Sequence, residues 1–160
     1  MDKSNTQTDN SARDKYVALY KELVGRLEQS GRPTGPYKDL TIKDYYDNRQ
    51  IYKNVWLYNR HHIDEIRISG SRLKLMSDYK DRKAIIVDFT EHALLHYLIV
   101  MAQTTNPNTG FMLNFGGHND PIGEWETYIK RGCQEFGIAF DARWRDRLTL
   151  IRFPTPDLRL

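Results

Sequence analysis

The stretch DFTEHALLH, Asp88–His96, decides how the middle of the chain folds. Asp88 followed three residues later by a glutamate is the pattern of a capping box, so a helix is predicted to begin here and to reach about Gln103. His92 and His96 are four residues apart and share one face of that helix. The opposite face is apolar and can be buried, through Leu94, Leu95, Leu98, Ile99 and Ala102.

Two more histidines, His61 and His62, precede this helix within residues 57–68, where a strand is predicted. A polar, basic connection over residues 69–83 follows, and a second strand is predicted over residues 83–89. Neutral imidazole is the commonest protein ligand of transition metals, and a His pair on a rigid helix can hold one cation with open positions. The predicted order is therefore strand, strand and metal-binding helix.

This order resembles the HNH, or ββα-metal, endonucleases, especially the small phage-type members. The matching residues are His61-His62-Ile63 and Glu91-His92-Ala93-Leu94-Leu95-His96, within a segment from Tyr58 to Met101. The resemblance implies an α+β fold, with a central ββα-metal motif at about 57–103 flanked by N- and C-terminal amphipathic helices. It also implies a DNA endonuclease in which His61, His92 and His96 bind the metal and His62 is the general base.

One divalent cation is expected as cofactor. Mg²⁺ prefers oxygen ligands, so a histidine-rich site favours Mn²⁺, Ni²⁺, Co²⁺ or Zn²⁺, although Mg²⁺ stays open as the working ion. Double-stranded DNA is the expected partner, and a homodimer is left open. Arg60 is a candidate phosphate contact, and further candidate nucleic-acid contacts in the connection are Arg67, Arg72, Lys74 and Lys83. Each of these cations has a plainer alternative reading as a solvated surface charge.

The chain also departs from the family pattern. Asp64-Glu65 stands where the family has a proline and a Gly-Gly, and Lys83 aligns with its middle asparagine. Asn59 or Asp81 are candidates to replace that asparagine. The alternative function is a catalytically silent, metal-containing nucleic-acid-binding or virion-associated protein. Glu91 can orient a histidine, but its place in the capping box already explains it.

Outside this motif the sequence predicts a disordered tail over residues 1–13 and a single nuclease domain over 14–160. Amphipathic helices are predicted over residues 14–29, 41–55 and 121–136, with the aromatic side chains of 41–55 packed in a core. Residues 31–36 and 104–120 are expected to be loops, the second with a short strand at 111–115. A short helix over 142–147 and a strand over 148–153 complete the prediction.

Composition sets broad limits. The 160 residues carry 24 Lys+Arg against 21 Asp+Glu, a formal net charge of +3, which is only a mild preference for anionic partners. The one cysteine, Cys133, excludes an intramolecular disulfide and fits a reducing compartment. No apolar run is long enough to span a membrane, and the N-terminus lacks the pattern of a signal peptide. We therefore expect a cytoplasmic protein with no membrane partner.

Overall fold

The structure is a computed structural model that describes residues 3–42, 47–52 and 55–149, with side chains from residue 10 onward. It confirms a mixed α+β fold. The helices are α1 (Lys3–Gln29), α3 (Gly70–Leu73), α4 (Phe89–Ala102) and α5 (Pro121–Phe136), with 3-10 helices η1 (Tyr37–Asp39), η2 (Ile63–Ile66), η3 (Gly110–Phe115) and η4 (Ala142–Arg147). The strands are β1 (Thr34–Pro36), β2 (Gln50–Tyr52), β3 (Val55–Trp56), β4 (Tyr58–His62) and β5 (Lys83–Asp88).

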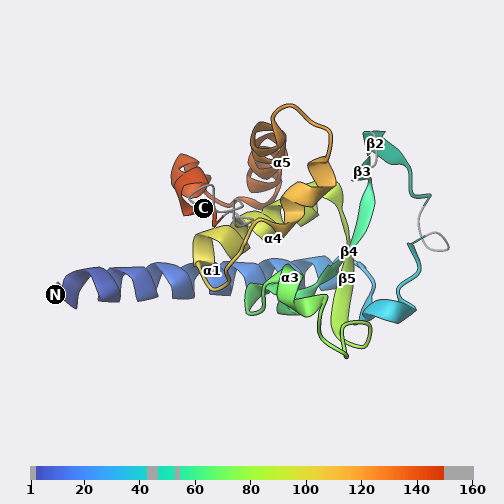
Figure 1. Cartoon of the computed structure of the whole chain (residues 1–160), viewed down its shortest axis with the longest axis horizontal. Coiled ribbons are helices and arrows are strands. Elements are labelled where there is room, and N and C mark those ends of the chain that lie inside the picture. Colours follow the sequence, from blue (N-terminus) through green and yellow to red (C-terminus); the bar gives the residue numbers. More distant parts are fainter. Residues whose placement is uncertain (1–2, 43–46, 53–54, 150–160) are drawn as a thin grey trace, which may run out of the picture.

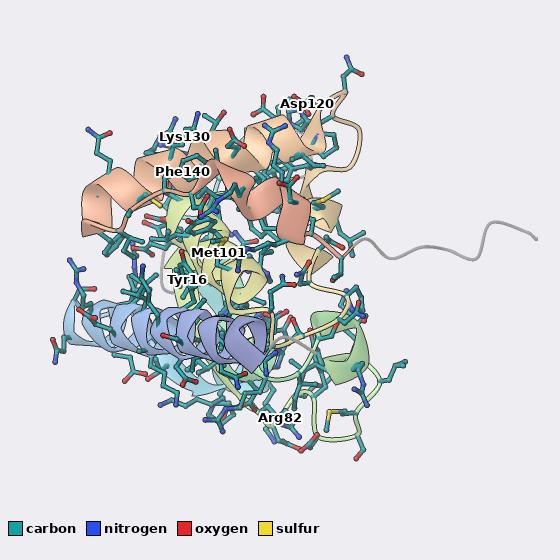
Figure 2. The ribbon with its side chains drawn as sticks, turned by 90° about the vertical axis from the view of Figure 1, so that its left-hand side faces the viewer. Tyr16, Arg82, Met101, Asp120, Lys130 and Phe140 are labelled. Atoms are coloured by element: carbon teal, nitrogen blue, oxygen red, sulfur yellow. The ribbon has the colours of Figure 1, made fainter. Side chains whose placement is uncertain are left out.

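Helix α4 is the centre of the molecule. It packs between α1 on one side and α5 on the other, and Figure 2 shows these three helices as successive layers. Tyr16 of α1 and Met101 of α4 lie at the boundary between two of them. A helix that is apolar on nearly all sides must be surrounded by protein. Gly132 lets α5 approach closely, because a Cβ there would lie 3.1 Å from the Cβ of Leu94.

The capping box that begins α4 is confirmed. The carboxylate of Asp88 accepts a hydrogen bond from the backbone N–H of Glu91 at 2.7 Å, and the carboxylate of Glu91 accepts one from the N–H of Asp88 at 2.8 Å. The same glutamate also accepts a 2.9 Å hydrogen bond from Arg32, so it is engaged in holding the helix start. The plainer reading of Glu91 is thus confirmed.

Replacing Asp88 by alanine tests this cap. We expect a loss of about 1 kcal/mol in the free energy of unfolding, because an N–H of the first turn loses its acceptor. Asp88→Asn keeps an accepting oxygen and should lose clearly less. Urea unfolding followed by circular dichroism measures both, and equal losses for the two variants would contradict the cap.

A three-stranded antiparallel sheet lies beside the helices, in the order β1-β5-β4, so that β4 is an edge strand. His61 pairs with Ile85 and His62 with Ala84. Ile85 faces the main core with α4, whereas Ala84 faces a smaller cluster around Leu40. Paired residues of antiparallel strands point to the same side of the sheet. The two histidines therefore point to opposite faces.

The N-terminal helix differs from its prediction. Helix α1 begins at Lys3, so residues 3–13 belong to it and are not a disordered tail, and its first turns project beyond the body of the molecule (Figure 1). These residues contain no glycine or proline, so helical hydrogen bonds can extend through them from the packed part downstream. None of the helices in the described ranges combines the length and apolar character needed to cross a membrane.

The region after α1 was predicted incorrectly. Residues 34–36, expected in a loop, form β1 on β5, and the predicted helix over 41–55 gives way to the β2–β3 hairpin in its C-terminal part. Residues 43–46 and 53–54 of that helix lie outside the described residues. Aromatic and β-branched residues favour short strands as readily as helices, which explains the error. Tyr52 and Trp56 are about half exposed, at 44% and 45%, instead of packed in the core.

Other boundaries follow local signals. The strand predicted over 57–68 ends at His62, where η2 begins, and the strand expected at 111–115 is the 3-10 helix η3. The predicted helix over 121–136 is confirmed as α5, which Asp120 caps through Gly123 and which ends at Gly137 in the left-handed conformation. The short helix over 142–147 is η4, and residues 150–153 of the last predicted strand lie outside the described residues.

Candidate metal centre

Three histidines from two elements converge on one point. Each of His61, His92 and His96 offers one ring nitrogen, and these three nitrogens lie within 4.8 Å of one another. The centres of the three rings are 4.8–5.1 Å apart. All three residues are buried. Ligand atoms around one tetrahedral Zn²⁺ lie roughly 3.4 Å apart, so side-chain shifts of about 1 Å bring all three to one cation. The residues that the sequence predicts as ligands are thus brought together.

Local structure explains the convergence. His92 and His96 are successive residues on one face of α4, and His61 reaches them because its side of β4 faces the main core. Phe111 of η3 packs against both helix histidines, with its ring stacked 5.2 Å from that of His96 and edge-on at 4.7 Å to that of His92. The cluster is therefore held between β4, α4 and an aromatic side chain from a later segment.

Tyr20 of α1 sets the protonation of His61. Its hydroxyl lies 2.7 Å from Nε2 of His61 and donates its single hydrogen to the carbonyl oxygen of Ile63 at 3.0 Å. The hydroxyl oxygen must then accept from Nε2–H. A neutral imidazole protonated at Nε2 carries a lone pair at Nδ1. In its neutral form His61 therefore presents the lone pair of Nδ1 to the cluster, as a metal requires.

The chemistry of the donor set fits a divalent cation. Nδ1 of His61 and Nδ1 of His92 are buried and have no hydrogen-bond partner. Burial lowers the pKa of His96 to about 4 and, together with the neighbouring histidines, that of His92 well below its ordinary value. Both rings are therefore neutral at pH 7, as ligands must be. Buried polar atoms without partners are rare, and an ion would satisfy them.

Glu65 of η2 lies beside two of these histidines, outside the set of three whose ligating atoms are all within 4.8 Å of one another. Its Oε2 is 2.9 Å from Nδ1 of His61 and 3.7 Å from Nε2 of His96. Burial raises the pKa of its carboxyl, but in acid, where the imidazoles of His61 and His96 are protonated, their charge and the His61 contact outweigh this and bring the pKa to about 2. The side chain is therefore a carboxylate at neutral pH. The sequence prediction did not include it.

His62 occupies the opposite face of the sheet, between two tyrosines. Its ring stacks on that of Tyr37 at 4.4 Å and 14°, and contacts Tyr79 at the same distance. Nε2 lies 2.8 Å from the carbonyl oxygen of Tyr79, which only accepts, so Nε2 carries the hydrogen. Burial lowers the pKa of His62, although this hydrogen bond opposes the change. The neutral ring is left with a basic Nδ1.

A cleft of about 1120 Å³ is lined by residues from both faces of the sheet. His62, Glu65, His92 and His96 all line it. A single bound molecule can thus contact both the histidine cluster and His62.

The predicted nucleic-acid contacts divide into two groups. Arg60 and Lys74 line the cleft, and Arg60 stacks its guanidinium 3.9 Å from the centre of the Tyr37 ring. Arg67 and Arg72 are exposed but do not line it, and Lys83 contacts Glu28 at 3.4 Å. Only Arg60 and Lys74 are therefore positioned to contact a molecule in the cleft.

Neither candidate for the family's asparagine links the strands. Asn59 donates to the carbonyl of Trp56 in its own segment, and Asp81 is paired with Lys38 at the surface. The carbonyl of Tyr79 instead orients His62, and Tyr20 orients His61. These two orienting groups, a backbone carbonyl and a side chain from a distant helix, have no sequence motif that could have predicted them. Glu65 had a sequence signal, because it is an acidic residue four positions after His61 where the family pattern differs.

In comparisons of the chain with known proteins, no family model, curated protein or solved structure matches it. The resemblance to HNH endonucleases therefore rests on the histidine motifs and their order along the chain. Any function assigned to the site has to be argued from its residues.

Proposed function

We propose that the chain is a metal-dependent DNA endonuclease of HNH type, with a ββα-metal motif formed by β4, β5 and α4. The observation that carries the proposal is the convergence of His61, His92 and His96 beside a cleft that His62 also lines. Hydrolysis of a phosphodiester needs a cation near the scissile phosphate and a base near the attacking water. The residues around the cleft offer both.

A divalent cation held by His61, His92 and His96 would supply Lewis-acid stabilisation of the charge that develops on the phosphate and the leaving oxygen. His62 takes a proton from the attacking water at Nδ1, because its Nε2–H is bound to Tyr79. The stack on Tyr37 holds the imidazole in place during this transfer. Each histidine of the adjacent pair thus has a separate task.

Arg60 and Lys74 provide positive charge along the cleft for the phosphates of the strand being cut. The guanidinium of Arg60 is held by Tyr37, through the ring stack and a 3.1 Å hydrogen bond to the backbone carbonyl. It is therefore presented in one orientation. We propose duplex DNA as the substrate and one of the transition-metal cations or Mg²⁺ as the cofactor.

Cleavage of supercoiled plasmid tests the function directly. Wild type with Mn²⁺ should convert the plasmid to nicked or linear forms, and EDTA should stop the reaction. His92→Ala should lose both metal stoichiometry and cleavage, because two imidazoles hold a cation less tightly than three. His118→Ala is the matched control, since His118 stacks on Tyr52 outside the cluster and should keep both. Metal-loaded wild type that leaves the plasmid intact would refute the nuclease.

The alternative is a catalytically silent, metal-containing nucleic-acid-binding protein. Glu65 favours it, because a carboxylate beside three histidines can fill the position that a catalytic site leaves open. Stoichiometric metal with DNA binding but without cleavage in the plasmid assay would support this alternative over the endonuclease.

A further inference from the structure

The contact between His61 and Glu65 brings two acceptors together. In the neutral ring, whose Nε2–H is donated to Tyr20, Nδ1 of His61 carries a lone pair. The carboxylate of Glu65 is also an acceptor, and the two atoms are only 2.9 Å apart in a buried place. Two lone pairs at this distance repel each other unless a positive charge lies beside both. A proton or a metal ion can supply that charge.

A shared metal ion fits the geometry of the contact. In a hydrogen bond the oxygen lies close to the line of the N–H bond. Here the two atoms are 2.9 Å apart, yet Nδ1 of His61 does not meet the geometry of a hydrogen bond with any partner. Two ligands of one ion have this relation, since each points at the ion and not at the other. Ligand atoms of one tetrahedral ion lie roughly 3.4 Å apart, so a shift of about 0.5 Å brings these two atoms to that spacing.

We propose that Glu65 is a fourth protein ligand, so that the free protein holds its cation with three imidazoles and one carboxylate. His96 supports the placement, because its Nε2 is 3.7 Å from the same carboxylate oxygen, close to the spacing of tetrahedral ligands. The inference rests on the metal centre of the proposed function and not on nuclease activity. Four protein ligands of this kind favour Zn²⁺ or Co²⁺ in a closed tetrahedral site.

A closed site changes what substrate binding requires. A phosphate oxygen can reach the cation only if the carboxylate moves aside or the coordination expands to five. Glu65 lies in the 3-10 helix η2, directly after β4, and lines the cleft where the phosphate would enter. It therefore closes the cation site in the free protein from the side of the substrate.

Metal affinity provides the test. Competition with a chromogenic chelator measures Zn²⁺ binding to the full-length wild type, to Glu65→Gln and to Asp64→Asn. Glu65→Gln should bind Zn²⁺ at least about tenfold more weakly, which is the lower range seen when a metal site loses a supporting group. Asp64→Asn removes the neighbouring carboxylate, which pairs with Arg82, and should bind like wild type. Equal affinity in all three proteins would overturn the role of Glu65.

The visible spectrum of the Co²⁺-loaded wild type is a second measurement that needs no variant. An intense tetrahedral band is expected, which should weaken and shift in Glu65→Gln. A weak, octahedral-type band in wild type would overturn the proposal even if the variant did not fold. Failure of wild type to bind any Zn²⁺ or Co²⁺ would refute the metal centre itself. Binding with an unchanged spectrum in Glu65→Gln would refute only the fourth ligand.

Discussion

His62→Ala is expected to reduce the rate of plasmid cleavage by about 10²–10⁴-fold, the usual contribution of a general base. The metal content should stay at the wild-type value, because His62 points to the opposite face of the sheet from the three ligands. His62 lines the cleft, and its Nε2–H is bound to the carbonyl of Tyr79, which leaves Nδ1 as the basic atom. Loss of cleavage with retained metal is therefore the result that separates the base from the ligands.

Two measurements on the same preparations complete this experiment. Single-turnover cleavage of a labelled duplex at saturating enzyme gives the rate of the chemical step, and metal analysis gives the stoichiometry. His118→Ala controls for the removal of an imidazole elsewhere in the chain. Cleavage by His62→Ala within threefold of wild type would refute the assignment. A parallel loss of bound metal would show that His62 acts as a ligand.

Trp125→Ala should cost about 3–5 kcal/mol in the free energy of unfolding, as removal of a large buried ring does. Trp125 of α5 is fully buried. Its Nε1–H donates to the carbonyl of Ala93 at 3.2 Å, and its ring packs edge-on against that of Trp144 at 4.8 Å. Phe111 also contacts it, at 5.5 Å between ring centres. Since Phe111 packs on His92 and His96, the same substitution should loosen the histidine cluster.

Trp56→Ala is the matched control, because this tryptophan is 45% exposed on the β2–β3 hairpin and should change stability by about 0.5 kcal/mol or less. Trp125→Phe keeps an aromatic ring and should fall between the two. Urea unfolding followed by circular dichroism measures all three. Similar midpoints for Trp125→Ala and Trp56→Ala would contradict the central packing of α5 on α4.

The elements that the sequence predicts well are those with local signals. The start of α4 depends on a capping box of four residues, Asp88–Glu91, and α5 on an Asp-Pro pair before it and a glycine after it. The strand β5 is a short apolar run between polar residues, which is readable without its partners. His92 and His96 follow from helical spacing alone. No local pattern predicts that they converge with His61. That prediction depended on the order of the two histidine motifs along the chain.

The failures involve partners that are distant in the sequence. β1 contains glycine and proline and resembles a loop until it is paired with β5 about fifty residues later. The aromatic residues before β4 fit helical spacing, but the chain uses Gln50–Tyr52 as a strand, and Asn48 binds the backbone N–H and carbonyl of Tyr58 through its side chain. Glu65 approaches His61 only because β4 ends and a tight 3-10 turn begins between them.

Tyr20 has a consequence for any attempt to move this site elsewhere. The segment from β4 to α4 contains all three histidines of the cluster, yet the hydroxyl that binds Nε2 of His61 comes from a residue 41 positions earlier in the chain. A graft of that segment into another scaffold would carry the imidazoles and leave the direction of their lone pairs undetermined. The donor geometry of the cluster therefore depends on α1 as well as on the segment that contains the histidines.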